Sequence, residues 1–114
     1  PDDAVKIKLC EICSELKVDF VKTSTGFGYG KQPDGKIGYR GATEHDIALM
    51  KKHSAPGMGI KPSGGVRTLD VVLKFVALGA TRIGTGSTFA IHAEAVKRFG
   101  GAAKSASGVN SAGY

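Results

Sequence analysis

Hydrophobic residues recur every three to four positions in four stretches of this chain, and short apolar runs lie between them. The periodicity predicts helices over residues 3–17, 43–53, 68–78 and 87–99. The apolar runs predict strands over about 18–24, 58–62 and 81–84. Because helices that alternate with strands form parallel sheets covered by crossover helices, the pattern predicts an α/β fold.

The apolar side of each helix predicts what that helix buries. In the first helix an apolar stripe at helical spacing is widened by three further residues; its members are Val5, Leu9, Ile12 and Leu16, with Ile7, Cys10 and Cys13 beside them. In the second helix, which Thr43 can cap, we expect burial of Ile47, Leu49 and Met50.

Glycine-rich segments divide the rest of the chain. Residues 26–41 predict a long loop, and Gly79 is placed to end the third helix. Glycine, serine and alanine dominate residues 100–114. We therefore expect one domain over residues 1–99, followed by a flexible tail over 100–114.

Two lysines interrupt the apolar runs that predict the first two strands. Lys22 follows Phe20 and Val21, and Lys61 follows Ile60. Burial of an ammonium group is costly, and it lowers the pKa of a lysine from roughly 10.4 toward neutrality. The free amine that results can attack a carbonyl carbon and form a Schiff base. The pattern therefore predicts buried lysines and amine catalysis.

The period of two along a strand relates these lysines to each other. Val21 and Ile60 lie on the opposite face of their strands from Lys22 and Lys61. If the two apolar residues face the helices, both lysines point toward the interior of a barrel. Both also lie near the C-terminal ends of their strands, where (β/α) barrels keep their chemistry.

Two glycine turns each follow a predicted strand and precede a helix: Ser63-Gly64-Gly65 and Gly84-Thr85-Gly86-Ser87. Amides exposed by glycine and aimed by a helix N-terminus form an anion pocket, and barrels often place a phosphate site after their last two strands. A single glycine turn of this kind usually has no binding role. Two in equivalent positions predict binding of a phosphorylated small molecule.

Composition and charge limit the classes of partner that we expect for this chain. The 114 residues have a net charge of +6, but the basic residues are scattered and the aromatic content is only 7%, so we expect no nucleic-acid partner. No apolar run reaches the roughly 20 residues that cross a membrane. The first residues, Pro1-Asp2-Asp3, show no signal-peptide pattern, so a cytoplasmic location is expected. A start at proline rather than methionine suggests that further residues precede it.

The remaining chemical candidates favour structural roles. Cys10 and Cys13 form a C-x-x-C inside the first predicted helix rather than at its start, so we interpret them as buried structural thiols. His45, His53 and His92 show no metal-ligand spacing. We therefore expect no metal and no cofactor.

At the lysines and the glycine turns the chain resembles the deoxyribose-phosphate aldolases, class I aldolases with a (β/α)8 barrel. The matching segments are DFVKTSTG (19–26), GIKPSGGVRT (59–68) and TRIGTGS (81–87), and their order and spacing fit over nearly the whole chain. The resemblance implies reversible cleavage of 2-deoxy-D-ribose 5-phosphate to acetaldehyde and D-glyceraldehyde 3-phosphate, a step in deoxyribonucleotide catabolism.

The resemblance also implies roles for the matched residues. Lys22 would form the Schiff base, and Lys61 would donate and accept protons. The residues around the substrate phosphate would be Gly64, Gly65, Gly84, Gly86 and Ser87, with Gly26, Val66 and Arg67 adjacent. Gly86 replaces a serine that many members have, which removes a hydroxyl contact. Tyr114 matches a terminal tyrosine that reaches the active site from the tail in this family.

One departure from the family is large. A (β/α)8 barrel needs eight strands and roughly 200 to 250 residues, whereas this chain supplies three strands. By resemblance these are the sixth to eighth, so we expect about three βα units from the C-terminal part of a TIM barrel. The family's catalytic aspartate is missing with the first five strands, and neither Asp19 nor Asp70 is an obvious substitute.

Three interpretations follow. We favour the first, in which the chain is the C-terminal part of an aldolase whose other part lies on a separate chain or is simply not included in this sequence. In the second it is an inactive fragment that self-associates, and in the third it belongs to another phosphate-binding, lysine-dependent barrel aldolase. Since unpaired strand edges and an open apolar face promote association, we expect the fragment alone to be inactive.

Overall fold

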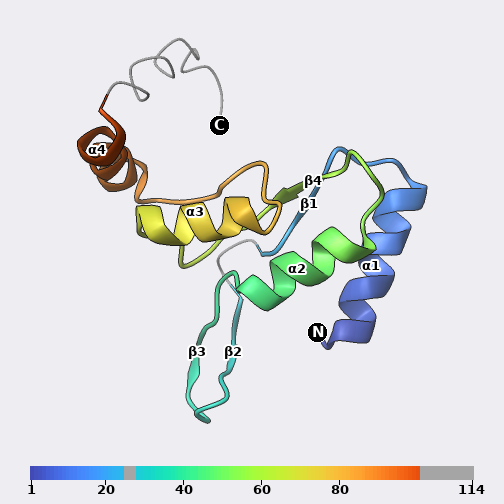
Figure 1. The fold of residues 1–114 in the computed structure, drawn as a ribbon. Coiled ribbons are helices and arrows are strands. Elements are labelled where there is room, and N and C mark those ends of the chain that lie inside the picture. Colours follow the sequence, from blue (N-terminus) through green and yellow to red (C-terminus); the bar gives the residue numbers. More distant parts are fainter. Residues whose placement is uncertain (25–27, 101–114) are drawn as a thin grey trace.

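The computed structural model describes residues 1–24 and 28–100 (Figure 1). Its elements in chain order are α1 (Asp3–Glu15), β1 (Phe20–Lys22), β2 (Tyr29–Lys31), β3 (Ile37–Tyr39), α2 (Glu44–His53), β4 (Gly59–Lys61), α3 (Leu69–Ala77) and α4 (Thr88–Phe99). The four helices predicted from periodicity are confirmed to within two residues at each end. Of the tail predicted over residues 100–114, residues 101–114 lie outside the described residues.

The helix ends follow the expected capping chemistry. The Asp2 carboxylate accepts from the Val5 amide at 3.0 Å, and the Thr43 hydroxyl accepts from the Asp46 amide at 3.1 Å. After α3, Gly79 has φ +106°, a left-handed conformation that glycine adopts without strain. The side chains at these ends thus satisfy amides that the helices leave unpaired.

Strands β1 and β4 form a parallel pair, with α2 as the crossover between them. Val21 lies opposite Ile60, and Lys22 lies opposite Lys61. The strand expected over 81–84 is wrong: in the described part of the chain this segment forms only an isolated parallel bridge between Ser63 and Gly84. The reason is that consecutive amides, of Thr81 and Arg82, both point at the Ile60 carbonyl, at 3.0 and 3.4 Å, which interrupts the alternation of a ladder.

The long loop expected over 26–41 is also wrong in part, because it contains a hairpin. β2 and β3 are antiparallel, with Tyr29 opposite Tyr39, and Figure 1 shows the hairpin projecting away from the helices. Its turn contains Gly35 at φ +81°. The hairpin is mostly exposed. It therefore lacks the alternation of apolar and polar residues by which a half-buried strand is recognised.

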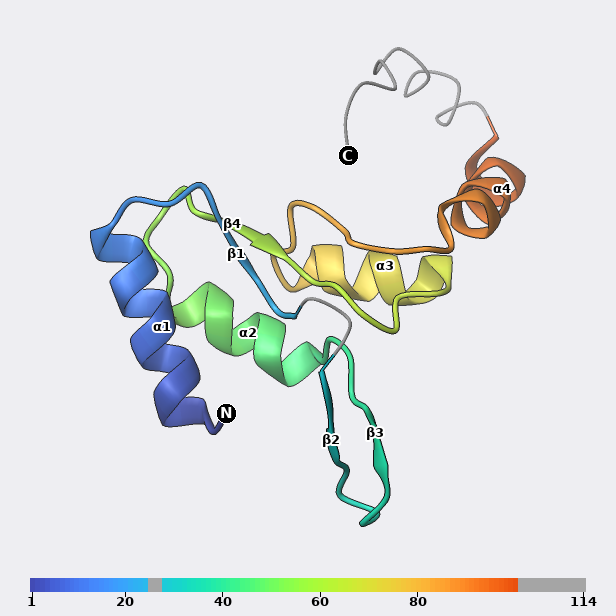
Figure 2. The same cartoon turned by 180° about the vertical axis from the view of Figure 1, so that it is seen from behind.

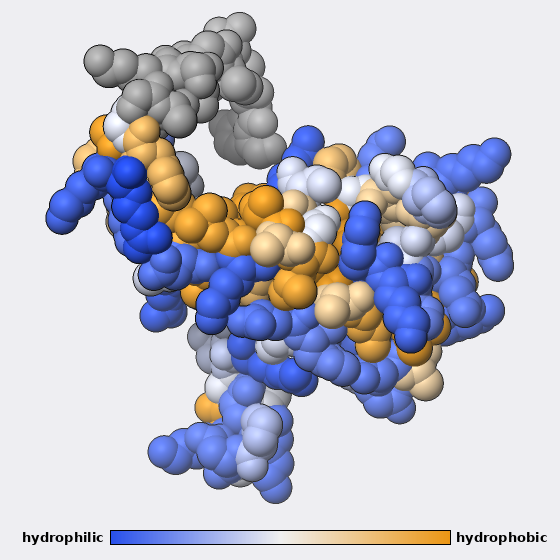
Figure 3. All heavy atoms as spheres, in the orientation of Figure 1, coloured by the Kyte–Doolittle hydropathy of each residue, from blue (hydrophilic) through white to orange (hydrophobic). Residues whose placement is uncertain are grey.

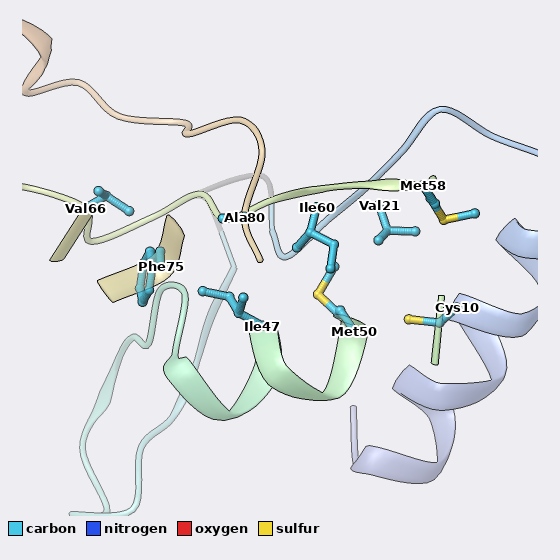
Figure 4. Packing of buried hydrophobic residues seen from close by; sticks show 9 residues of the cluster. All are labelled: Cys10, Val21, Ile47, Met50, Met58, Ile60, Val66, Phe75 and Ala80. Carbon is cyan, nitrogen blue, oxygen red and sulfur yellow. The ribbon is translucent and has the colours of Figure 1, made fainter. Parts of the chain in front are cut away.

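The hydrophobic core lies on one face of the β1–β4 pair. Figure 4 shows Val21 and Ile60 meeting side chains from α1, α2 and α3, and the buried cluster consists of Cys10, Val21, Ile47, Met50, Met58, Ile60, Val66, Phe75 and Ala80. Ile47 and Ile60 have no exposed surface. Burial of such a side chain contributes roughly 1.5–3 kcal/mol, so this face holds the helices to the sheet. The predicted burial of Ile47 and Met50 is confirmed, and Leu49 is half-buried.

Two other apolar surfaces are open to solvent. Most of the apolar stripe on α1 is exposed, with Leu9 at 52% and Leu16, which caps the helix, at 71%, and only Cys10 of that stripe is buried in the core. α4 buries no residue and stands beyond α3, apart from α1 and α2 (Figure 2). Figure 3 shows hydrophobic side chains gathered over α3 and toward the middle of the molecule, whereas the hairpin is mostly hydrophilic. These helices offer surfaces that the described residues leave uncovered.

Candidate active site

The two lysines lie side by side on the face opposite the core. Because Lys22 and Lys61 are register partners in neighbouring parallel strands, their backbones are roughly 4.8 Å apart and their side chains share a face. The predicted strand phase is therefore confirmed: Val21 and Ile60 face the helices, and the lysines face away from them.

The prediction that these lysines are buried is wrong for this chain. Lys22 is exposed, Lys61 is half-buried, and none of the charged residues in 1–24 and 28–100 is buried. The helices cover the sheet face that carries Val21 and Ile60, and the described elements leave the lysine face open. The shared face, rather than desolvation, is what relates the two amines in this structure.

Both lysines line one open pocket together with the two glycine turns. The pocket has a volume of about 460 Å³, and its lining residues are Lys22, Lys61, Ser63, Gly64, Gly65, Val66, Arg67, Gly84, Thr85, Gly86 and Ser87. The structure thus brings together every predicted site residue that it describes. Gly26 and Tyr114 lie outside the described residues.

The glycine turns present backbone rather than side chains to this pocket. Gly64 and Gly65 have φ values of +96° and +73°, and a Cβ added at Gly65 or Gly86 would meet no atom within 4 Å. Among the described residues, the amides of Gly65 and Gly86 donate no hydrogen bond. These amides are available to an anion, as the sequence predicts.

Side chains at the pocket add positive charge. Lys22, Lys61 and Arg67 all line it, and no carboxylate does. Ser87 precedes α4, and its side chain makes no capping bond to the helix. An anion between the two turns would therefore meet amides, a hydroxyl and three cations.

Two threonines that the sequence reasoning missed as site residues connect these parts. Thr23 Oγ1 donates to the Ser63 carbonyl at 3.1 Å and accepts from the Ser63 amide at 3.0 Å, which ties β1 to the first turn. Thr85 Oγ1 donates to the Val66 carbonyl and accepts from the Ser87 amide at 2.9 Å, which ties the two turns together. Both threonines lie inside the segments that carry the family resemblance, and that position was the available signal.

The aspartates near the lysine segments do not enter the pocket. Neither Asp19 nor Asp70 is among its lining residues. Asp70 is paired with Arg98 at 2.7 Å, and the hydrogen bond from that guanidinium lowers the pKa of the Asp70 carboxyl. The expectation that neither aspartate serves as the acidic partner agrees with this geometry.

The cysteines have the structural role that their position predicts. Cys10 is buried in the core, Cys13 is half-buried against it, and both are free thiols. Burial raises the pKa of the Cys10 thiol, which disfavours the reactive thiolate.

A cluster between α1 and α2 was not predicted. Ligand atoms of Asp3, His45 and Asp46 lie within 4.8 Å of one another. The Lys6 ammonium occupies this cluster, 3.2 Å from Asp3 Oδ1 and 2.7 Å from Asp46 Oδ1. Lys6 therefore bridges the two carboxylates and joins the two helices.

Comparison with known proteins identifies the family. No protein-family model matches the chain. It is 46% identical over 112 residues to the deoxyribose-phosphate aldolase of Rhodopirellula baltica, a match that covers 98% of this chain and 42% of that protein. It is also 46% identical over 89 residues to the deoxyribose-phosphate aldolase of Streptococcus sanguinis, covering 78% of this chain and 36% of that protein. The chain belongs to the deoxyribose-phosphate aldolase family. It corresponds to the C-terminal part of these aldolases.

Solved aldolase structures have the same fold. A protein described as QR15, an aldolase, superposes with a TM-score of 0.73 at 36% identity, covering 87% of this chain and 40% of that protein. The deoxyribose phosphate aldolase of Aeropyrum pernix, described as tetrameric, gives a TM-score of 0.67 at 29% identity and covers 87% of this chain and 38% of that one. The chain therefore has the fold of part of an aldolase TIM barrel. It spans about two fifths of the length of these relatives.

No helix among the described residues combines the length and the hydrophobicity needed to cross a membrane.

Proposed function

We propose that this chain carries the lysine and phosphate part of a deoxyribose-phosphate aldolase site. The observation that carries the proposal is the register that sets Lys22 beside Lys61 in one pocket with both glycine turns. The reaction is the reversible cleavage of 2-deoxy-D-ribose 5-phosphate to acetaldehyde and D-glyceraldehyde 3-phosphate. The names and identities of the relatives support this choice of reaction class.

In the proposed mechanism Lys22 is the nucleophile. Its neutral amine adds to the aldehyde carbon of the substrate, and loss of water leaves a protonated imine. The hydroxyl at C3 loses its proton, the C2–C3 bond breaks, and the bonding electrons move toward the imine nitrogen. D-Glyceraldehyde 3-phosphate leaves, and protonation and hydrolysis of the remaining enamine release acetaldehyde and regenerate Lys22. No metal or cofactor enters these steps.

Lys61 and the turns have supporting roles. Lys61, the register partner of Lys22, is placed to donate and accept protons on the same face. The turns would hold the phosphate through the amides of Gly65 and Gly86, with the charge of Arg67. Since the phosphate does not react, its binding energy is available to position the aldehyde at Lys22.

Other parts of the proposed site lie beyond the described residues. Tyr114, as a catalytic tyrosine, and Gly26, beside the phosphate, keep the roles that the family resemblance implies. A cytoplasmic setting in deoxyribonucleotide catabolism is also part of the proposal and rests on the family reaction.

The partner that we propose for this part of the site is the N-terminal part of an aldolase barrel, which lies outside this sequence. The chain covers 42% of the Rhodopirellula baltica relative and 36% of the Streptococcus sanguinis relative, and the described elements leave the lysine face open. The exposed stripe on α1 supplies apolar surface for such a partner. The acidic member of the site would come with that part, so the fragment alone would be inactive.

Borohydride trapping tests the proposal. The chain would be incubated with acetaldehyde and borohydride, alone and mixed with the N-terminal part of the Rhodopirellula baltica relative, and the labelled lysine located by peptide mass spectrometry. We expect one ethyl group on Lys22 in the mixture, lost in Lys22→Arg and retained in Lys52→Arg, which alters an exposed lysine on α2.

Each alternative has its own outcome in this experiment. Labelling spread over exposed lysines and unchanged by Lys22→Arg would reject the Schiff-base role. Labelling of Lys22 only by a different carbonyl compound would indicate another lysine-dependent aldolase. Absence of labelling in the mixture, together with self-association of the chain, would indicate an inactive half-barrel.

A further inference from the structure

Tyr39 connects the lysine strand to the first glycine turn. Its hydroxyl lies 2.7 Å from Ser24 Oγ, just beyond the end of β1. Ser24 Oγ donates to the Ser63 carbonyl at 3.0 Å, and either hydroxyl can donate in the contact between Tyr39 and Ser24. A weaker contact of 3.4 Å joins the Tyr39 hydroxyl directly to the same carbonyl. Tyr39 therefore completes a hydrogen-bonded chain from the hairpin through β1 to the turn.

Tyr39 and the residues that follow it are in close contact with the turn Ser63-Gly64-Gly65. A Cβ at Gly64 would overlap the Tyr39 hydroxyl, and a Cβ at Gly41 would lie 2.7 Å from the Gly64 carbonyl oxygen. The Ala42 amide donates to that oxygen at 3.0 Å. Only glycine lets the two segments come this close, and both glycines have positive φ values, +96° and +71°. Segment 39–42 thus contacts the turn at several adjoining points.

The contact lies at the base of a hairpin that otherwise faces solvent. Tyr29, the register partner of Tyr39, is 75% exposed, whereas Tyr39 is half-buried. Tyr39 is not among the residues that line the lysine pocket. It can therefore affect a ligand there only through the turn that it contacts.

We propose that Tyr39 is a positioning residue that sets the distance between the phosphate-binding amides and Lys22. Ser24 lies two residues after Lys22, and Gly65 follows the residue on which Tyr39 packs. A turn held at both ends presents its amides in one arrangement, which reduces the ordering cost of binding an anion. The inference rests on the function proposed above and adds to it a role for the hairpin.

Substitution by phenylalanine tests this role. Tyr39→Phe keeps the ring and removes the hydrogen bond to Ser24, and Tyr29→Phe is the matched control in the same hairpin. With the 114-residue chain and inorganic phosphate as the probe, NMR titration should show binding weakened roughly 2- to 10-fold by Tyr39→Phe, the value of about one hydrogen bond. Tyr29→Phe should bind as the unchanged chain does. Amide exchange at Ala42 should be faster only in Tyr39→Phe.

An activity measurement separates positioning from loss of structure. In the mixture with the N-terminal part, Tyr39→Phe should raise KM for the phosphorylated substrate by the same factor. It should leave kcat for an unphosphorylated aldehyde unchanged, because Lys22 is intact. If Tyr39→Phe does not fold, Ser24→Ala removes the same bond from its other partner and should give the same weakening.

The outcomes distinguish this inference from the proposed function. Phosphate binding by the unchanged chain, with Tyr39→Phe equal to Tyr29→Phe in both affinity and Ala42 exchange, would overturn the positioning role alone. Absence of phosphate binding by the unchanged chain would overturn the phosphate pocket and the positioning role together, while Schiff-base trapping at Lys22 would still stand as a separate result.

Discussion

The two faces of the β1–β4 pair differ sharply although they are made by adjacent residues. On one face Val21 and Ile60 are 7% and 0% exposed and are packed under three helices. On the other face Lys22 is exposed and Lys61 is half-buried. A single step along each strand thus separates the hydrophobic core from the pocket.

The difference shows that folding and chemistry draw on separate residues here. The covered face is packed against apolar side chains of this chain's own helices. The open face carries lysine amines and lies beside backbone amides that can bind a ligand. Phe20 packs near the N-terminal end of this pair: a Cβ at Gly59 would overlap its ring, and the Arg82 guanidinium lies 4.2 Å from the ring centroid. Changes on the two faces should therefore have separable effects on stability and on activity.

The largest expected loss of stability follows from a substitution on the covered face. Ile60→Ala should reduce the free energy of unfolding by roughly 2–5 kcal/mol, because it leaves a cavity where the side chain is fully enclosed. Ile37→Ala, at a position 82% exposed on the hairpin, should change it by less than about 0.5 kcal/mol. Urea denaturation followed by circular dichroism measures both, and equal losses would contradict the assignment of the core to one face.

A smaller loss of stability is expected when the ion pair between Lys6 of α1 and Asp46 of α2 is removed. Partial burial tends to raise the pKa of Asp46, but hydrogen bonds from Lys6 and Thr43 outweigh it and hold that pKa below 3.8. The hydrogen bond that Lys6 donates to Asp46 raises the pKa of Lys6 above 10.5. Lys6→Met should therefore lower the free energy of unfolding by roughly 1 kcal/mol at neutral pH.

The direction of these pKa shifts sets the pH dependence. A carboxylate with a lowered pKa stabilises the folded state above its ordinary pKa and loses that contribution as the pH falls through the folded value. The difference between Lys6→Met and the unchanged chain should thus decrease below pH 3.8. Urea denaturation of both chains at neutral and acidic pH measures this difference in the free energy of unfolding. A difference that grew on acidification would show that the Lys6–Asp46 pair does not stabilise the fold.

The smallest effect on stability is expected on the open face. Lys22→Met should change the free energy of unfolding by less than about 0.5 kcal/mol, because the side chain is exposed. The same substitution should abolish borohydride trapping in the mixture with the N-terminal part. A large loss of stability would mean that the lysine supports the fold, and the contrast between the faces would then fail.

Much of the site could be predicted because it depends on local rules. Helix periodicity and capping residues such as Thr43 placed the helices, and the pleat of period two placed Lys22 and Lys61 on one face. Glycine between a strand and a helix pointed to the turns. Each of these inferences needs only residues within a few positions of one another.

The predictions that were wrong depend on contacts between distant segments. The burial of Lys22 depends on what covers its face, and no local pattern reports that. The segment 81–84 looks like a strand but is bonded to β4 irregularly at Ile60. The hairpin was missed because its exposed strands need no apolar alternation, and the role of Tyr39 followed from its contact with Gly64, 25 positions away in the sequence.

The sequence alone determined the helices, the common face of the two lysines and the turns that accompany them. These follow from backbone periods and from the conformations that glycine allows. Only the tertiary structure decided that Lys22 is exposed and Lys61 half-buried, and that hydrogen bonds of Thr23, Tyr39 and Thr85 connect the segments around the pocket. The physical reason is that exposure and hydrogen bonding are properties of neighbours in space, and the neighbours of this pocket come from separate segments of the chain.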